Sequence, residues 1–149
     1  MDDTPLGTQD LICFALYSAN NAMNRLYRPL LAQLGLTYPQ YLVLVSLWDR
    51  DGKTVGQLGA ELGLESNTLT PLLKRMAEAG LVTRTRADAD ERVVVIALTD
   101  KANGLKAEVA DLAACVFEAT GLTLKDARRL RDQVFALRDA IEHRDTRAD

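Results

Sequence analysis

The stretch TVGQLGAELGLESNTLTPLLKRMAEAGLVTRTRADADERVVVIAL, residues 54–98, decides the fold. It opens with Thr54 and Gln57, a threonine followed three residues later by glutamine, which is the pattern of a helix-capping box. Leucines then recur at helical spacing as far as Gly63. The stretch is therefore predicted to begin with a short amphipathic helix that ends at a glycine.

A second helix is predicted directly afterwards, capped by Ser66 or Asn67 and ended by Gly80. Its apolar residues should face the core, and they are Leu69, Leu72, Leu73 and Met76. Pro71 lies at the fourth or fifth helical position, where at most one intrahelical hydrogen bond is lost. It should therefore limit the start of the helix without breaking it.

After this helix the apolar pattern changes to that of strands. LVTRTR alternates, ADADE is polar and turn-like, and RVVVIAL is rich in β-branched residues, which predicts a β-hairpin with a charged tip. Two short helices joined by a tight turn and followed by a hairpin make a winged helix-turn-helix. In this architecture the second helix enters the major groove of DNA, and the hairpin reaches the neighbouring backbone or minor groove.

Candidate DNA contacts lie on both parts of this unit. Small hydrogen-bonding groups stand where base edges would lie, namely Ser66, Asn67, Thr68 and Thr70. Cations suited to phosphates are Lys74, Arg75, Arg84 and Arg86. From Ser66 to Arg86 these cations oppose only Glu78, a local balance of +3 in a chain of net charge -3. A merely solvated face is the simple alternative, but the architecture favours DNA binding. At the hairpin tip, Asp90 and Arg92 are expected to pair and to orient the arginine.

Helices are also predicted on both sides of this unit. Apolar residues recur at helical spacing from an N-cap expected at Thr8 to a stop at Gly35. Pro29 should bend or split this helix near Arg28, because it removes one hydrogen bond and clashes with the preceding turn.

Thr37 should cap the next helix, which stops at Asp51 and Gly52. Beyond the hairpin, helical spacing returns from Thr99 and is interrupted at Gly121. The polar tail EHRDTRAD is expected to fray.

Length and composition fit one cytoplasmic domain. The chain has 149 residues, of which 48% are apolar and 26% charged, and no apolar run approaches the roughly 18 residues of a membrane span. The N-terminus MDDTPLGTQD is acidic and lacks the basic and apolar regions of a signal peptide. Two distant cysteines suit neither a disulfide framework nor a zinc site, so each thiol needs its own explanation.

The segment from Leu11 to Tyr41 places one cysteine among tyrosines, and these residues are Cys13, Tyr17, Tyr27 and Tyr38. At 100° per residue, Tyr17 and Tyr27 lie about 40° to either side of Cys13 on one helix. Tyr27 is nevertheless about 21 Å along the axis, too far for its phenol to reach the thiol. If Tyr27 and Tyr38 contact Cys13, we expect them to come from the partner protomer of a two-fold dimer.

Phenolic hydroxyls can donate hydrogen bonds that favour a thiolate, and apolar neighbours of Cys13 suit an alkyl or lipid hydroperoxide. Attack on the peroxide would give a sulfenic acid, which a second thiol captures, and Cys115 is the available one. The simple alternatives are an inert buried Cys13, and Cys115, Tyr27 and Tyr38 serving only in packing.

Over residues 8 to 142 the sequence resembles the multiple-antibiotic-resistance regulator (MarR) family of winged-helix repressors. The resemblance rests on TVGQLGAELGLESNTLTPLLKRMAEAGLV, on DER in the wing, and on LTDKA, where Ala102 replaces the usual glycine of the family. It implies a homodimer with intertwined first and last helices, which binds a near-palindromic double-stranded DNA operator and releases it on sensing a signal.

The segments ICFALYSAN, RLYRPLL and GLTYPQYLVL resemble one branch of that family, the organic hydroperoxide resistance regulators (OhrR). This resemblance implies that Cys13 is the peroxide sensor and that Tyr17, Tyr27 and Tyr38 surround it. It further implies a disulfide between subunits that involves Cys115.

The expected fold is mostly α with a small β-hairpin wing, a winged helix-turn-helix in an intertwined helical dimer. One MarR-type domain, 1–149, is expected, with dimerisation helices at 8–36 and 99–143 and a DNA-binding lobe at 53–98. The expected function is a redox-sensing repressor that needs no metal or cofactor and is not an enzyme. The alternatives are a MarR-type regulator with a non-covalent ligand in the dimer cleft, and a thiol peroxidase.

Overall fold

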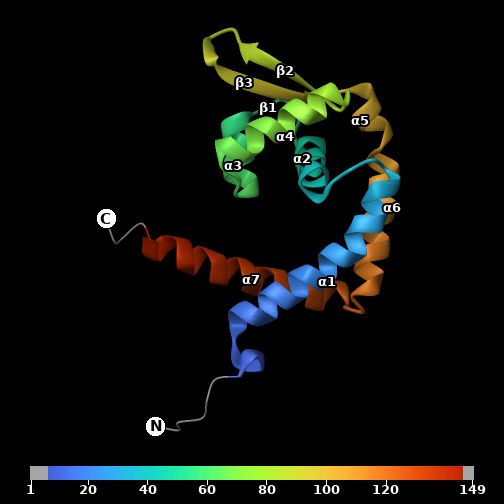
Figure 1. The fold of residues 1–149 in the computed structure, drawn as a ribbon, viewed down its shortest axis with the longest axis vertical. Coiled ribbons are helices and arrows are strands. Elements are labelled where there is room, and N and C mark those ends of the chain that lie inside the picture. Colours follow the sequence, from blue (N-terminus) through green and yellow to red (C-terminus); the bar gives the residue numbers. More distant parts are fainter. Residues whose placement is uncertain (1–6, 146–149) are drawn as a thin grey trace. The chain divides into compact units, whose positions relative to one another are not determined.

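The computed structural model describes residues 7–145. The first six residues of the acidic N-terminus and the last four of the polar tail lie outside this range. The described elements are η1 (Thr8–Asp10), α1 (Ile12–Gln33), α2 (Tyr38–Asp49), β1 (Lys53–Thr54), α3 (Val55–Leu62), α4 (Ser66–Glu78), β2 (Val82–Ala87), β3 (Asp90–Leu98), α5 (Asp100–Gly104), α6 (Lys106–Ala119) and α7 (Leu124–Asp145) (Figure 1). The chain divides into two compact units, Met1–Leu112 and Ala113–Asp149.

The predicted helix-turn-helix is present as α3 and α4. Thr54 and Gln57 form the predicted capping box, with their side chains and backbone amides bonded reciprocally at 2.9 and 3.1 Å. Gly63 ends α3 with a φ of 65°, a left-handed conformation that glycine adopts without strain. A Cβ on Gly59 would lie 2.8 Å from the carbonyl oxygen of Leu64, so the tight turn between the two helices requires a glycine there.

The α4 helix buries one face and exposes the other. Its buried side chains are the four predicted ones, Leu69, Leu72, Leu73 and Met76. The predicted cap is wrong, because α4 already begins at Ser66 and Glu65 occupies the N-cap position without a side-chain cap. Pro71 is consequently the sixth helical residue, and the helix continues through it.

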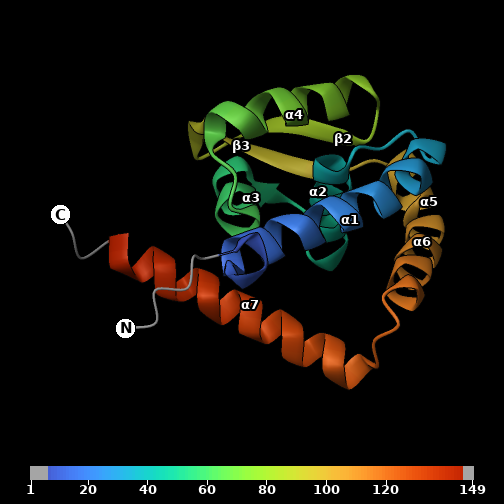
Figure 2. The ribbon, with the colours of Figure 1, turned by 60° about the horizontal axis from the view of Figure 1, so that its bottom comes forward.

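The predicted hairpin is present as β2 and β3, and it lies beside α4 in both Figure 1 and Figure 2. The sequence pattern did not predict β1, whose two residues pair with Ile96 and Val95 and make a three-stranded antiparallel sheet in the order β1-β3-β2. The register shifts between Arg86 and Ala87, so three residues of β3, 91–93, have no partner on β2. The fold class, mostly α with a small β wing, is confirmed.

The first helix differs from the prediction at its start. Thr8 lies in a separate 3-10 turn, and α1 begins at Ile12 with Leu11 at the N-cap and no side-chain cap. The helix is not split at Pro29, which lies inside a continuous run to Gln33. Gly35 follows with a φ of 68°, as a C-terminal stop requires.

Helix α2 follows the prediction at its start. Thr37 and Gln40 form a second capping box. The helix ends at Asp49, two residues before the predicted stop at Asp51. It is largely buried, and its core side chains include Val43, Leu44 and Leu47.

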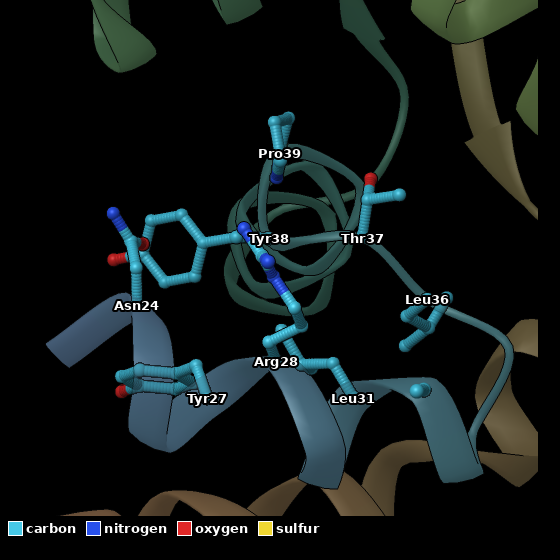
Figure 3. Close-up of a pocket in the computed structure, with 9 residues that line it drawn as sticks. Asn24, Tyr27, Arg28, Leu31, Leu36, Thr37, Tyr38 and Pro39 are labelled. Atoms are coloured by element: carbon cyan, nitrogen blue, oxygen red, sulfur yellow. The ribbon is translucent and has the colours of Figure 1, made fainter. Parts of the chain in front are cut away.

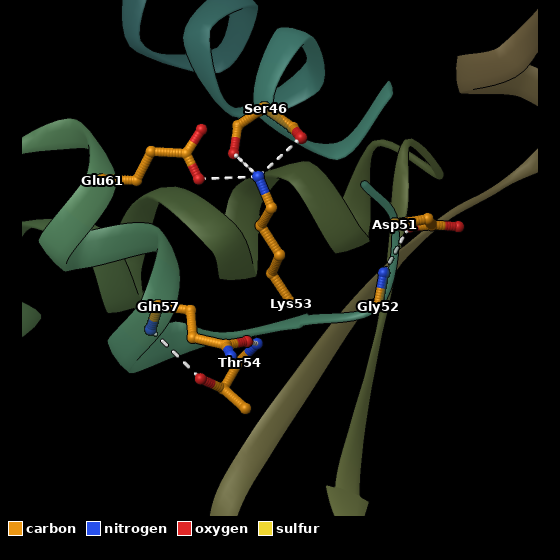
Figure 4. A network of polar contacts seen from close by, with 7 residues as sticks. All are labelled: Ser46, Asp51, Gly52, Lys53, Thr54, Gln57 and Glu61. Carbon is orange, nitrogen blue, oxygen red and sulfur yellow. Dashed lines mark hydrogen bonds and ion pairs between the residues drawn. The ribbon is translucent and has the colours of Figure 1, made fainter. Parts of the chain in front are cut away.

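Lys53 is a charged residue inside the fold, and only 3% of its surface is exposed. Its ammonium donates to the Ser46 carbonyl oxygen at 2.9 Å, to Ser46 Oγ at 2.8 Å and to Glu61 Oε2 at 2.6 Å (Figure 4). These acceptors use all three ammonium protons. The bond from Lys53 holds the pKa of the Glu61 carboxyl below its usual range. The network therefore joins α2, β1 and α3.

The helices after the sheet are divided differently from the prediction. Thr99 caps a short helix, α5, by accepting a bond from the Ala102 amide at 3.3 Å, so the alanine in LTDKA does not disturb this cap. Leu105 then separates α5 from α6. Gly121 has a φ of 67° between α6 and α7. The tail was predicted to fray from Glu142 onward. This prediction is wrong as far as Asp145, because α7 continues to that residue.

Several apolar side chains of α7 are exposed. The exposed ones on this helix are Leu124, Leu130, Val134, Phe135 and Ile141. In α1 a similar set is exposed, consisting of Ile12, Leu16, Tyr17 and Met23. Exposed apolar surface of this extent marks an interaction site more often than a free surface.

No described helix by itself has the length and apolar composition of a membrane span. The pair α1 and α2 meets that criterion jointly, with a bend of 75° between the two helices, on length and composition alone.

Leu44 and Val45 offer a matched pair on α2, because Leu44 is fully buried and Val45 is 42% exposed. We expect Leu44→Ala to lower the free energy of unfolding by about 2–5 kcal/mol, since it leaves a cavity in the core. Val45→Ala should change it by less than about 0.5 kcal/mol. Urea unfolding at a single protein concentration measures both; equal losses would contradict this placement of the core.

Candidate functional site

The exposed face of α4 carries the polar residues predicted to read DNA. Those that are exposed are Ser66, Asn67, Thr68, Thr70, Lys74 and Arg75. Because Ser66 and Asn67 are the first two helical residues and do not cap the helix, their side chains are available to a ligand. The hydroxyl of Thr68 lies 3.4 Å from Asn67 Oδ1, a weak contact between neighbours.

A groove of about 370 Å³ lies where the starts of α3 and α4 meet the wing. Its lining consists of Thr54, Val55, Gly56, Ser66, Thr70, Arg84, Arg92, Val93 and Val94. Two guanidinium groups and three hydroxyls are thus gathered from four elements, β1, α4, β2 and β3, with no carboxylate in the lining. Arg86 is exposed two residues from Arg84 but does not line this groove. Such a set of donors suits the phosphate backbone of a nucleic acid.

Asp90 and Arg92 form the expected pair at the wing tip. Arg92 Nε and Nη2 lie 3.2 and 3.3 Å from the two carboxylate oxygens of Asp90, and the Arg92 amide donates to the same carboxylate at 3.0 Å. These bonds hold the pKa of the Asp90 carboxyl below its usual range. Arg92 remains 92% exposed, so the pair orients its guanidinium without enclosing it.

Cys13 is the second residue of α1 and is exposed. Because α1 begins later than predicted, the thiol lies in the first helical turn, where backbone N–H groups have no partner within the helix. Such a position favours a negative charge. Tyr17 follows one turn later and is 64% exposed. In the single chain Cys13 is thus exposed and not buried.

Tyr27 and Tyr38 lie together (Figure 3), and Tyr41 packs against both rings. The ring centroids are 5.1 Å apart for Tyr27 and Tyr38, 5.6 Å for Tyr27 and Tyr41, and 5.7 Å for Tyr38 and Tyr41. The sequence reasoning missed Tyr41, although its spacing of three from Tyr38 places both on one face of α2. Burial, more than the neighbouring Tyr41, raises the pKa of Tyr27 and of Tyr38. Both phenols therefore stay protonated at neutral pH.

A pocket of about 410 Å³ adjoins this cluster between α1 and the start of α2. It is lined by Asn24, Tyr27, Arg28, Leu31, Ala32, Leu36, Thr37, Tyr38 and Pro39 (Figure 3). Cys13 is not among them. Since α1 is continuous, the fourteen residues from Cys13 to Tyr27 correspond to about 21 Å of helix. Within one chain, the structure does not bring the Cys13 thiol and the tyrosine cluster together.

Cys115 is exposed on α6 and belongs to the second compact unit. Both cysteines are free thiols. Among residues 7–145, no cluster of three or more His, Cys, Asp or Glu side chains could hold a metal ion.

Comparison with known proteins places this geometry in a family. A model of the family described as transcriptional regulator SarA/Rot matches residues 25–109. The HTH-type transcriptional regulator TtmR of Methylorubrum extorquens (strain PA1) is 47% identical over 142 residues, which cover 95% of this chain and 73% of TtmR. The organic hydroperoxide resistance transcriptional regulator of Bacillus subtilis (strain 168) is 38% identical over 136 residues, with coverages of 91% and 92%.

Solved structures agree with the sequence relatives. AbfR of Staphylococcus epidermidis matches with a TM-score of 0.75 at 33% identity, over 88% of this chain and 91% of AbfR. Reduced AbfR bound to DNA matches with a TM-score of 0.76 at 32% identity, with coverages of 89% and 90%. The fold, the matched family model and these relatives together show that the chain belongs to the MarR family of winged-helix transcriptional regulators and is of the OhrR type.

Proposed function

We propose that this regulator is a homodimeric repressor that releases operator DNA when an organic hydroperoxide oxidises Cys13. The observation that carries the proposal is the exposed thiol in the first turn of α1, in a chain similar to a regulator of organic hydroperoxide resistance. One MarR-type domain, 1–149, would carry out both peroxide sensing and DNA binding in the cytoplasm. Residues 8–36 and 99–143 would form the dimer, and residues 53–98 would bind DNA.

The DNA-binding half rests on the exposed face of α4 and on the groove beside it. In this proposal α4 enters the major groove with its N-terminal polar side chains at base edges, and the wing lies along the neighbouring backbone. Arg84, Arg92, Lys74 and Arg75 neutralise phosphates. The similar AbfR has been solved bound to DNA, which supports this assignment.

The dimer rests on the apolar side chains that α1 and α7 expose. A two-fold pairing of these helices would remove them from water and repeat the recognition helix at a second half-site. Centres about 34 Å apart match one turn of B-DNA, so the operator is expected to be a near-palindrome.

The sensing site is completed only across this dimer. The thiolate of Cys13 attacks one peroxide oxygen, so that an S–O bond forms, the O–O bond breaks and an alcohol leaves after taking up a proton. Tyr27 and Tyr38 of the partner supply protonated phenols to the site, and Tyr17 lies on the thiol's own helix. The thiol of Cys115 then attacks the sulfenic sulfur, which gives a disulfide between subunits and releases water.

A second candidate is a MarR-type regulator that binds a small ligand non-covalently, with Cys13 incidental. The pocket beside Tyr27 and Tyr38 favours it, because it combines apolar walls with the phenols and the Arg28 guanidinium. A thiol peroxidase is the third candidate. No observation favours it, since TtmR and the Bacillus subtilis relative are named transcriptional regulators.

Cys13→Ser separates these candidates. We expect cumene hydroperoxide to weaken operator binding of the wild type by roughly 5- to 150-fold, the usual range of coupling between two sites. The Cys13→Ser variant should bind the operator equally well but ignore the peroxide, because it lacks the nucleophile. A gel-shift titration measures both, and release of DNA from the serine variant would reject redox sensing.

Cys115→Ser tests the second chemical step. After peroxide treatment the wild type should run as a covalent dimer on a non-reducing gel, and the Cys115→Ser variant as a monomer. Dithiothreitol should abolish the dimer band and serves as the control. A dimer band that persists in the variant would remove Cys115 from the mechanism.

Arg92→Ala tests the wing. We expect weaker operator binding, because the oriented guanidinium is lost. The slope of log affinity against log salt concentration should also fall by about one, the contribution of one phosphate contact. Arg50→Ala is the control, because Arg50 is also an exposed arginine and lies outside the residues assigned to the dimer and to DNA binding. The rate of Cys13 oxidation should not change in either variant. Equal affinities of Arg92→Ala and wild type would show that the wing is misassigned.

A further inference from the structure

The hydrogen-bond network of Lys53 lies between the tyrosine cluster and the groove beside the wing, and it is part of neither. Its position is unusual for a lysine, because every proton of its ammonium is committed inside the protein. Two of the acceptors come from a single residue of α2, Ser46, and the third comes from Glu61 of α3 (Figure 4). Lys53 itself belongs to the strand that borders the wing.

On one side, the network connects to the tyrosine cluster through α2. Tyr38 is the first residue of this helix, and Tyr41 lies within its first turn. Ser46 follows Tyr41 by five residues, which is about 7.5 Å of helical rise. The intervening Val43 and Leu44 are fully buried, so this part of α2 moves as one body with its core contacts.

On the other side, the network connects to the wing through β1. Lys53 pairs with Ile96 of β3, and Thr54 pairs with Val95. A second tether runs from the same loop, because the Asp51 carboxylate accepts the Leu98 amide at 2.9 Å. The same strand, β3, carries Arg92 and Val94 into the groove beside α4.

We propose that Lys53 is the positioning residue that transmits the state of the tyrosine cluster to the wing. This inference rests on the proposed function, because it assumes that the cluster takes part in sensing. A displacement of α2 either carries β1 with it or withdraws two of the three acceptors from a buried ammonium. Since an unpaired buried charge is strongly unfavourable, β1 follows α2. The wing and the groove residues of β3 then move with β1.

Lys53→Met tests this coupling, because methionine fills much of the same space without charge or donors. The Glu61 carboxylate that it leaves unpaired is 44% exposed and can be hydrated. We expect the reduced variant to bind the operator within about threefold of wild type and Cys13 to be oxidised at the same rate. The ratio of oxidised to reduced dissociation constants should fall at least about fivefold. An unchanged ratio would overturn the proposal.

A second arm of the experiment uses no peroxide. Tyr38→Leu, which disrupts the cluster, is introduced into the wild type and into the Lys53→Met variant, and operator dissociation constants are measured for all four proteins. We expect a change of at least about fivefold from Tyr38→Leu in the wild type and of less than about twofold in the Lys53→Met background. Additive effects, or no effect of Tyr38→Leu in the wild type, would overturn the proposal.

The two arms separate this inference from the proposed function. If peroxide fails to release DNA from the wild type, redox sensing is rejected while the four-protein cycle still decides the role of Lys53. Ser46→Ala is the milder variant if Lys53→Met does not fold, because it removes one acceptor and should reduce the coupling in the same direction. Val45→Ala, which changes an exposed side chain of α2 next to Ser46, is the control and should leave both readouts at wild-type values.

Discussion

The burial of one face of α4 is the constraint on which the rest of the DNA-binding lobe depends. Leu69, Leu72, Leu73 and Met76 fill the core. An α-helix alternates its faces with a period of 3.6 residues, so fixing these four side chains also fixes which residues face outward. The polar first turn and the cations of α4 are therefore presented together and beside the wing. Core packing and the proposed DNA contacts therefore use two faces of a single helix.

The same regularity explains which features could be predicted from the sequence. Local signals were sufficient for the cap at Thr37, the capping box at Thr54, the stops at Gly35 and Gly63, and the hairpin, because each depends on residues a few positions apart. The predicted start of α4 was wrong. Serine and asparagine are favoured at N-cap positions, so Ser66 or Asn67 was expected there, but Glu65 occupies the N-cap without a side-chain hydrogen bond. Thr8 is not the N-cap of α1, because residues Thr8–Asp10 form a separate 3-10 turn.

Features that depend on distant residues were not predictable in this way. The two residues of β1 form a strand only because β3 lies beside them, and no period can be read from two residues. Lys53 looks like an ordinary surface lysine until Ser46 and Glu61 surround its ammonium. Tyr41 joins Tyr27 only when α1 and α2 pack together. The candidate thiol site is not assembled even in the folded single chain, because the fixed rise of α1 leaves Cys13 and the tyrosine cluster apart.

The shifted register at the wing tip has a consequence for how such a regulator can change over evolutionary time. Residues 91–93 have no partner on β2, and Arg92 is almost entirely in solvent. Substitutions in this short segment remove no core contact and no ladder bond to β2, so most of them should leave the stability of the fold nearly intact. The proposed DNA contacts of the wing can therefore change without a loss of folding, whereas Gly59 or Leu73 cannot vary so freely. Related regulators could in this way acquire different operators on one unchanged scaffold.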